Sequence, residues 1–329
     1  MTRRMRGGRA VSMGLASVLL SLLVVPGPAG ATSVPGTTCA VFPRNNVWHM
    51  NVSALRVNAR SAVWKRATHA GRTFLHPDFG PPSYGIPYAV VGAGHAKVSV
   101  SFTYANESDP GPYPFGSDIP IEGGSDRHAL VIDRSDCTLY ELFAARWDGG
   151  DPKAGSGAIF HLTGPKANQL RPAGWTSADA AGLPIYAGLL RYDEVKAGLV
   201  DHAIRMTVGC THDAYIWPAR HAAGTSDRRC PPMGARFRLR ASFAIGRFAP
   251  NVRVVLRAMK RYGLIVADNG SDWYFQGAVD SRWTYRFVDQ LKQIPASAFV
   301  AVDERACKVG DRSAAFAYGP GCPAPSSGP

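Results

Sequence analysis

HALVIDRSDCTLYELFAARW, residues 128–147, is the stretch that decides the fold class. Two apolar segments, residues 129–132 and 139–143, flank the polar segment Arg134–Cys137. Short runs rich in Val, Ile, Leu, Tyr and Phe on either side of a polar turn are typical of two paired strands. We therefore predict a strand, a turn over residues 134–137 and a second strand.

Other segments repeat the strand pattern. AKVSVSFTYA, residues 96–105, alternates apolar and small polar residues, which predicts a half-buried strand. Residues 202–208 and 235–243 are predicted as further strands. In the last of these, alternate positions carry arginines, at Arg236, Arg238 and Arg240. We expect these arginines to lie on a solvated sheet face, with an anion-binding strip as the alternative.

Only two segments favour helices. Residues 250–263 begin with Pro250 and end at Gly263, which are typical first and stop residues of a helix. Residues 284–295 begin with Thr284, a possible cap. Predicted strands far outnumber these helices, and no strand–helix–strand alternation indicates a parallel sheet. We therefore predict a mainly β domain: an antiparallel β-sandwich of two packed sheets with a few peripheral helices.

The first 31 residues have the pattern of an export signal peptide. A basic start precedes the apolar stretch Val11–Val25, and Ala29–Ala31 resembles a cleavage site. The apolar stretch is shorter than the roughly 20 residues needed to span a bilayer, so we expect it to be removed. We predict a secreted protein beginning near Thr32, with no membrane span after cleavage. The pair Arg3–Arg4 leaves both the general and the twin-arginine export routes open.

The composition is that of a globular protein with surplus positive charge. Hydrophobic residues make up 46% and charged residues 19% of the chain, and 33 residues are aromatic (14 Phe, 12 Tyr and 7 Trp). The formal charge of +13 falls to +9 once the four arginines of residues 1–31 are removed. This charge suits an anionic polymer. The plainer alternative, which we favour, is a GC-rich genome that selects arginine codons, since only 8 of the 37 basic residues are lysine. No run of five basic residues follows the signal, so we predict no nucleic-acid partner.

The chain has six cysteines, which are expected to pair in an exported protein. The spacing suggests Cys210–Cys230 and Cys307–Cys322, which leaves Cys39–Cys137; this is one of the fifteen possible connectivities. The spacing does not match that of zinc ligands, so we predict no metal and no cofactor. We expect a single domain over residues 32–306 and a flexible tail, residues 307–329, tethered by its disulfide.

RYGLIVADNGSDWYFQG, residues 261–277, places carboxylates beside an aromatic run. Asn269–Gly270 predicts a tight hairpin turn, because both central residues of a type I′ turn need positive φ. The surrounding residues suit sugar binding, in which a ring stacks on the sugar and carboxylates accept its hydroxyls. Too few oxygen donors are present for a calcium loop. The candidates here are Asp268 and Asp272 as catalytic groups, and Trp273 and Tyr274 as substrate-binding rings.

A second cluster lies in PIEGGSDRHALVIDR, residues 120–134. Glu122 and Asp126 occur in a glycine-rich turn before a strand, and Arg127 and His128 follow. An acid and an imidazole at a strand entry suit general acid–base catalysis, so Glu122, Asp126 and His128 are catalytic candidates and Arg127 a substrate-binding one. The plainer alternative is that Asp126 caps the turn and His128 pairs with an internal carbonyl.

A third cluster lies in residues 189–208. Asp193 and Glu194 are adjacent, so in a strand they would face opposite ways, and only Asp193 is taken as a catalytic candidate. Asp201–His202 precede a strand, as Asp126 and His128 do. The catalytic templates GxSxG, HExxH, the P-loop and GxGxxG after a strand are absent from the sequence.

Taken together, several of these segments resemble a group of exported bacterial proteins, largely actinobacterial. The segments are LHPDFG, GGSDRHALVIDR, LYELFAARW, GWTSADAAGLPI, LLRYDEVKAG, HAIRMTV, PPMGARFRLRASF and RYGLIVADNGSDWYFQG. The resemblance extends over nearly the whole mature chain. It implies a single extracellular domain and carries no established activity.

We therefore expect a secreted protein that acts on or binds extracellular polysaccharide or another cell-wall polymer. In a glycoside hydrolase, Glu122 or Asp126 would protonate the leaving oxygen, and one of the other acids would act as base or nucleophile. Trp217 and Trp273 would supply stacking surfaces.

Two alternatives stay open. On a uronate substrate a lyase fits better, with arginine neutralising the carboxylate and His128 taking the proton. The alternative from another class is a non-catalytic wall-associated or carbohydrate-binding module, in which aromatic side chains hold a glycan without an acid pair.

Overall fold

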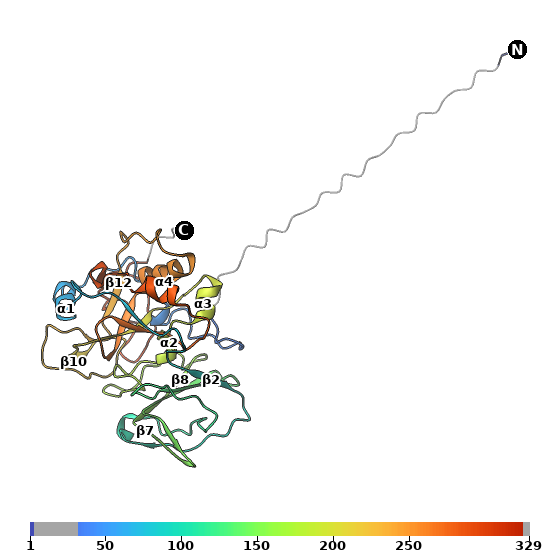
Figure 1. Cartoon of the computed structure of the whole chain (residues 1–329), viewed down its shortest axis with the longest axis vertical. Coiled ribbons are helices and arrows are strands. Elements are labelled where there is room, and N and C mark those ends of the chain that lie inside the picture. The colour runs from blue at the N-terminus through green and yellow to red at the C-terminus, as the bar shows by residue number, and fades with distance from the viewer. Residues whose placement is uncertain (3–31, 325–329) are drawn as a thin grey trace. The chain divides into compact units, whose positions relative to one another are not determined.

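A six-stranded mixed sheet lies in the larger hydrophobic core of the protein. The computed structural model describes residues 1–2 and 32–324, so residues 3–31 of the predicted signal peptide lie outside the described residues (Figure 1). The sheet order is β1 (His76–Asp78), β14 (Tyr274–Gln276), β9 (Ile204–Val208), β13 (Leu264–Asn269), β12 (Arg236–Leu239) and β15 (Phe299–Ala301). β9 pairs parallel with β13 on one side and antiparallel with β14 on the other.

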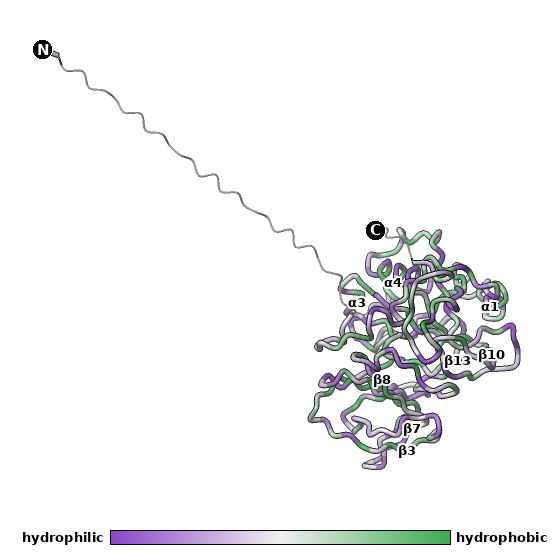
Figure 2. The backbone as a smooth tube through the Cα atoms, turned by 180° about the vertical axis from the view of Figure 1, so that it is seen from behind, coloured by the Kyte–Doolittle hydropathy of each residue, from purple (hydrophilic) through white to green (hydrophobic). Residues whose placement is uncertain are grey.

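The predicted hairpin over residues 128–147 forms the centre of a four-stranded sheet. Its order is β2 (Tyr88–Val91), β4 (Ala129–Asp133), β5 (Thr138–Phe143) and β8 (Ser156–His161). Alternate residues of β4 face different cores: Leu130 and Ile132 belong to the larger core, whereas Ala129 and Val131 belong to a smaller one. Burial on both faces explains why this strand is apolar from Ala129 to Ile132. β8 and β13, one from each of the two larger sheets, can be followed in Figure 2.

Two small sheets complete the strand structure. A three-stranded sheet contains β3 (Ser101–Phe102), β7 (Asp151–Ala154) and β6 (Arg146–Asp148), and a two-stranded parallel sheet contains β10 (His212–Tyr215) and β11 (Pro232–Met233). β7 and β8 lie in residues 148–183, a stretch marked by glycines and prolines.

Both predicted helices are present. α4 (Pro250–Arg261) packs against β12, and Gly263 follows it with a φ of 75°. A Cβ atom at Gly263 would lie 2.7 Å from the Phe237 carbonyl oxygen, so this position favours glycine. α5 (Tyr285–Leu291) is capped by Thr284, whose hydroxyl accepts from the Phe287 amide. Short helical segments that were not predicted are α1 (Ser61–Ala67), α2 (Ile185–Gly188), α3 (Tyr192–Ala197), and the 3₁₀ turns η1 (Val47–His49), η2 (Ala105–Glu107) and η3 (Ala296–Ala298).

The prediction of a mainly β fold is confirmed, since 28% of the residues are in strands and 15% in helices. The prediction of wholly antiparallel sheets is wrong. β9 and β13 are parallel neighbours, joined by a long connection that contains α4, as parallel strands require. The predicted hairpin at Asn269–Gly270 is also wrong, because β9 lies between β13 and β14.

The arginine pattern of β12 needs a correction as well. Arg236 is fully buried, and its Nε lies 2.7 Å from Glu304 Oε1. Arg238 is half-buried and donates to the Ser53 carbonyl, whereas Arg240 is exposed. The expected solvated face is therefore wrong for Arg236, because the chain after β15 brings a carboxylate over that position.

The three suggested disulfides are confirmed: Cys39–Cys137, Cys210–Cys230 and Cys307–Cys322. They indicate folding in an oxidising compartment. In the described part of the chain, no helix combines the length and apolar character needed to cross a membrane.

The segment after Cys307 contacts the domain beyond the predicted tether. The Val47 amide donates to the Ala314 carbonyl at 2.8 Å. The Trp217 indole donates to the Ser313 carbonyl, also at 2.8 Å. Hydrogen bonds as well as the disulfide therefore hold this segment.

Candidate functional site

A cavity of about 320 Å³ lies where the loop of residues 176–180 meets the end of β13. Its lining combines an aromatic ring with ionisable groups: Tyr104, Glu107, Asp179, His221 and Asp268. These residues come from four separate stretches of the chain. Ionisable groups that converge in a cleft mark a candidate functional site.

Asp268 reaches the cavity from the end of β13. The pairing of β13 with β9 shifts register between Val266 and Asp268, and such an irregularity re-aims a side chain. Asp268 Oδ2 accepts from the Ala180 amide at 3.3 Å, and Oδ1 accepts from the Asn269 amide at 2.8 Å. The side chain is 25% exposed. Burial raises the pKa of Asp268 despite the nearby positive charge of Arg205.

Asp179 lies behind Asp268 and is completely buried. Its Oδ1 accepts from the Ala181 and Leu183 amides at 3.0 and 3.1 Å. Its Oδ2 has no hydrogen-bond partner among the described residues and lies 3.7 Å from Arg205 Nη2. Burial raises the pKa of Asp179 to about 7, and Arg205 opposes this shift. The group is therefore close to half-protonated at neutral pH.

Arg205 joins the two aspartates. It lies on β9, is 3% exposed, and its Nη2 is 3.5 Å from Asp268 Oδ2. Its charge also lowers the pKa of Glu141, although burial dominates and raises that pKa to about 7. Glu141 accepts from the amides of Ile185 and Tyr186 at 2.9 and 2.8 Å. One buried guanidinium thus lies among several carboxyl groups whose pKa values burial raises.

Glu107 and His221 form a second ionisable pair in the lining. Glu107 Oε2 lies 3.6 Å from His221 Nε2 and accepts from the Thr176 amide at 3.3 Å. His221 Nδ1 lies 2.7 Å from the Ala180 carbonyl oxygen, so this nitrogen carries the donated proton. Both side chains are about one-quarter exposed. Ala180 therefore links the two groups, since its carbonyl accepts from His221 and its amide donates to Asp268.

Glu122 and His128, which the sequence predicted as catalytic groups, are in contact. Glu122 Oε2 lies 2.6 Å from His128 Nδ1, and His128 Nε2 lies 3.1 Å from the Ala178 carbonyl. Burial lowers the pKa of His128, but the hydrogen bond and charge of Glu122 outweigh it and the net pKa is raised. His128 is 4% exposed and both ring nitrogens are engaged. It therefore supports the cavity wall at Ala178, and its burial and engaged nitrogens argue against the predicted role as a proton-abstracting base.

Three other predicted residues lie outside the lining of the cavity. Asp126 is exposed in its turn. Arg127 is half-buried and donates from Nε to the Ala145 carbonyl at 3.1 Å. Asp193 is in helix α3 rather than a strand, and forms an exposed ion pair with Arg282 at 2.8 Å.

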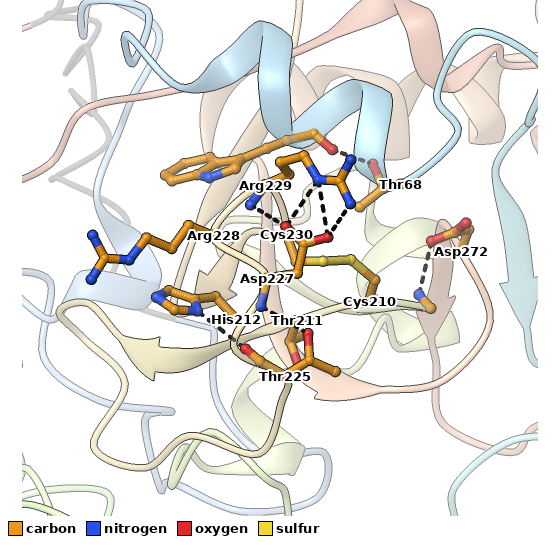
Figure 3. Close-up of a disulfide and its surroundings, with 12 residues drawn as sticks. Thr68, Cys210, Thr211, His212, Thr225, Asp227, Arg228, Arg229, Cys230 and Asp272 are labelled. Atoms are coloured by element: carbon orange, nitrogen blue, oxygen red, sulfur yellow. Dashed lines mark hydrogen bonds and ion pairs between the residues drawn. A yellow bond between two sulfur atoms is a disulfide. The ribbon is translucent and has the colours of Figure 1, made fainter.

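The carboxylate of Asp272 and the rings of Trp273 and Tyr274 make contacts within the fold. Asp272 Oδ1 accepts from the Gly209 amide at 2.8 Å, beside the Cys210–Cys230 disulfide (Figure 3). Trp273 is fully buried against Phe237 and Phe299, so its predicted role as a sugar-stacking surface is wrong. Tyr274 is stacked on His76, with ring centroids 4.0 Å apart.

Trp217 lies elsewhere. It is half-buried and lines a larger cavity of about 710 Å³. The smaller cavity remains the candidate catalytic site, because Asp268, a carboxyl group with a raised pKa that is partly open to solvent, lies there.

Several site residues were not predicted: Tyr104, Glu107, Asp179, Arg205 and His221. Arg205 had a signal, since it is a lone charge inside the apolar strand HAIRMTV. Buried charges are rare unless they are paired, so this arginine pointed to carboxylates that approach it from elsewhere in the chain. Nothing local marked Glu107 or His221.

In the described part of the chain, no group of three or more His, Cys, Asp or Glu side chains is arranged to hold a metal ion. Comparison with known proteins found no matching family model, no matching curated protein and no matching solved structure.

Proposed function

We propose that the protein is a secreted enzyme that cleaves an extracellular polysaccharide by general acid–base catalysis at the Asp268 cavity. The observation that carries the proposal is the meeting of two different acids in one cleft. Asp268 has a raised pKa, and Glu107 is paired with His221 and partly open to solvent. Hydrolysis of a glycosidic bond needs such a division of labour between a proton donor and a base.

Asp268 acts as the acid in this proposal. Burial keeps its proton to a higher pH than an exposed aspartate would, so it can protonate the leaving glycosidic oxygen as the carbon–oxygen bond breaks. Glu107 accepts a proton from the attacking water. The exposed ring of Tyr104, at the same cavity, offers an apolar surface to a sugar ring. In this proposal Tyr104 is the sugar-stacking ring, the role that the sequence had suggested for Trp273.

Asp179 and Arg205 act through Asp268. They are too deeply buried to contact a polymer, but Arg205 fixes Asp268 Oδ2 and balances the local charge. This arrangement argues against a uronate lyase at the same cavity. Arg205 is already shared by two aspartates, and both nitrogens of His128 are engaged. Neither group is available to neutralise a substrate carboxylate or to abstract a proton.

Export from the cell remains part of the proposal, and the three disulfides support it, because they form and persist in oxidising compartments. The membership of a group of exported bacterial proteins, suggested by segments such as GGSDRHALVIDR, is likewise proposed here.

The test is product release from a panel of polysaccharides by the purified mature protein. We expect Asp268→Asn and Glu107→Gln each to lower the rate by about 100-fold or more, since general acid–base groups contribute that much. Asp193→Asn, an equal change at an exposed ion pair, should keep the wild-type rate. Urea unfolding confirms that the variants are folded.

Two results would contradict the proposal. One is a wild-type rate in Asp268→Asn on a cleaved substrate. The other is binding of a glycan without any product, which would favour the non-catalytic module.

A further inference from the structure

The larger cavity has a floor suited to a sugar ring. It lies between residues 56–64, residues 216–217 and residues 302–308. Its apolar part includes Trp64, Trp217 and Val302. The Trp217 ring is held in place by the hydrogen bond from its Nε1 to the Ser313 carbonyl. A volume of about 710 Å³ lies within the usual range of ligand-binding pockets.

The rim of this cavity is cationic. Four basic residues line it and all are exposed: Arg56, Arg60, Arg305 and Lys308. Arg60 donates from Nη2 to the carbonyl of Arg228, so its charge is not consumed by a carboxylate in that contact. Figure 3 shows the Arg228 side chain pointing away from the neighbouring Asp227–Arg229 pair.

Two acids lie in the same lining. Asp303 offsets the charge of Arg305, whose Nη2 lies 2.7 Å from Oδ2. Lys308 is likewise paired with Asp311 at 2.7 Å, so the positive surplus of the rim rests on Arg56 and Arg60. Glu304 is buried and paired with Arg236, which lies outside the cavity. Burial raises the pKa of Glu304 to about 7, so it carries only part of a negative charge at neutral pH. Positive charge therefore prevails at the mouth, in line with the surplus of the whole chain.

We infer that this cavity binds a uronate-bearing polysaccharide, with the sugar ring against the tryptophan-containing floor and its carboxylate at the Arg56–Arg60 rim. Arginine suits this role because its planar guanidinium forms paired hydrogen bonds with a carboxylate. The inference rests on the proposed function only in treating the bound polymer as the substrate. The binding site itself does not depend on cleavage at Asp268.

The experiment is a titration of the mature protein with oligogalacturonate, followed by calorimetry and by tryptophan fluorescence. The comparison ligands are a neutral oligoglucan of equal length and an inorganic polyphosphate of equal charge. We expect the uronate to bind most tightly, and we expect its affinity to fall as salt is added. The double variant Arg56→Glu/Arg60→Glu should bind it about tenfold or more weakly.

Arg247→Glu/Arg286→Glu is the matched control, because it makes the same charge change at exposed residues of a different surface hollow. It should bind as the wild type does. Asp268→Asn should also keep full affinity, which separates failure of this inference from failure of the proposed catalysis. Equal affinity for the neutral oligoglucan or for polyphosphate would overturn the inference. So would unchanged binding by Arg56→Glu/Arg60→Glu.

Discussion

Asp179 and Asp268 share one nitrogen of Arg205: their Oδ2 atoms lie 3.7 and 3.5 Å from its Nη2. The Oδ2 atoms of Asp179 and Asp268 therefore cannot be farther apart than the sum of their distances to Arg205 Nη2. Two carboxyl groups so close to one positive charge do not both ionise easily, and the charge of Asp268 adds to the burial that raises the pKa of Asp179. The two carboxyl groups therefore form a coupled pair, with Asp268 open to the cavity and Asp179 buried.

This pair predicts a stability that falls as pH rises. The pKa of Asp179 is about 7 in the folded protein, against an ordinary value of 3.8. Between these values the folded state holds a proton that the unfolded state has lost, so the free energy of unfolding decreases by up to about 1.4 kcal/mol per pH unit. Asp179→Asn removes this contribution, and the variant should lose less stability than the wild type between pH 5 and pH 8.

Urea unfolding with intact disulfides measures the effect. Glu141 and Glu304, whose pKa values burial also raises to about 7, keep their own contributions in the variant. Asp193→Asn provides the control, because Asp193 is exposed and should leave the pH dependence unchanged. An identical slope in Asp179→Asn and the wild type would refute the assignment.

Local signals in the sequence were enough for several elements. The hairpin over residues 128–147, helix α4 and the cap at Thr284 depend on neighbouring residues, and the structure has them. The pairing of β9 with β13 depends on a connection that closes over more than fifty residues. Asn269–Gly270 is a strong turn signal, yet β9 occupies the place that the hairpin partner would take. Non-local strand pairing therefore overrode a local preference.

The candidate site shows the same limit. Asp268 was predicted from its own surroundings, beside an aromatic run. The residues that give it chemical meaning come from other segments: Glu107 from η2, Arg205 from β9 and His221 from a loop after β10. A single sequence contains no information on which distant segments meet, beyond the requirement that a buried charge such as Arg205 finds partners.

The buried ion pair between Arg236 and Glu304 can be tested by substitution. Arg236→Leu leaves the buried Glu304 without its guanidinium, and removal of one partner of a buried pair typically costs about 3–5 kcal/mol. Arg240→Leu, on the same strand face but exposed, should change the free energy of unfolding by less than about 0.5 kcal/mol. Urea unfolding at pH 7 compares the two. Similar small losses in both variants would mean that Glu304 is neutral and needs no partner.

Trp273 separates packing from ligand binding. Its ring is fully buried and its Nε1 donates to the Thr68 carbonyl at 2.9 Å. Trp273→Ala should therefore lower the free energy of unfolding by about 3–5 kcal/mol through the cavity it leaves. Trp217→Ala, at a half-buried ring, should cost less. If Trp273→Ala kept its stability but lost glycan affinity, Trp273 would be a sugar-stacking ring despite its burial.

The Glu122–His128 pair predicts a pH window of its own. The pKa of His128 is raised, so its contribution is complete below the ordinary histidine value of 6.5 and is lost as pH rises through the folded pKa. Burial raises the pKa of Glu122, but the hydrogen bond from His128 outweighs it and the net pKa is lowered. The contribution of Glu122 is therefore present above about 4.5 and lost at lower pH. The pair stabilises the fold most between these values.

Glu122→Gln should reduce the free energy of unfolding by about 1.5–3 kcal/mol near pH 5.5, where a charge-assisted hydrogen bond is lost, and by less near pH 8. Burial then acts on His128 without opposition, so the pKa of its imidazole should fall, as a proton NMR titration would record. Asp272→Asn, which changes the partner of His69 instead, should leave the His128 titration unchanged. If His128 titrates in Glu122→Gln as in the wild type, Glu122 does not control the imidazole that holds Ala178 at the cavity wall.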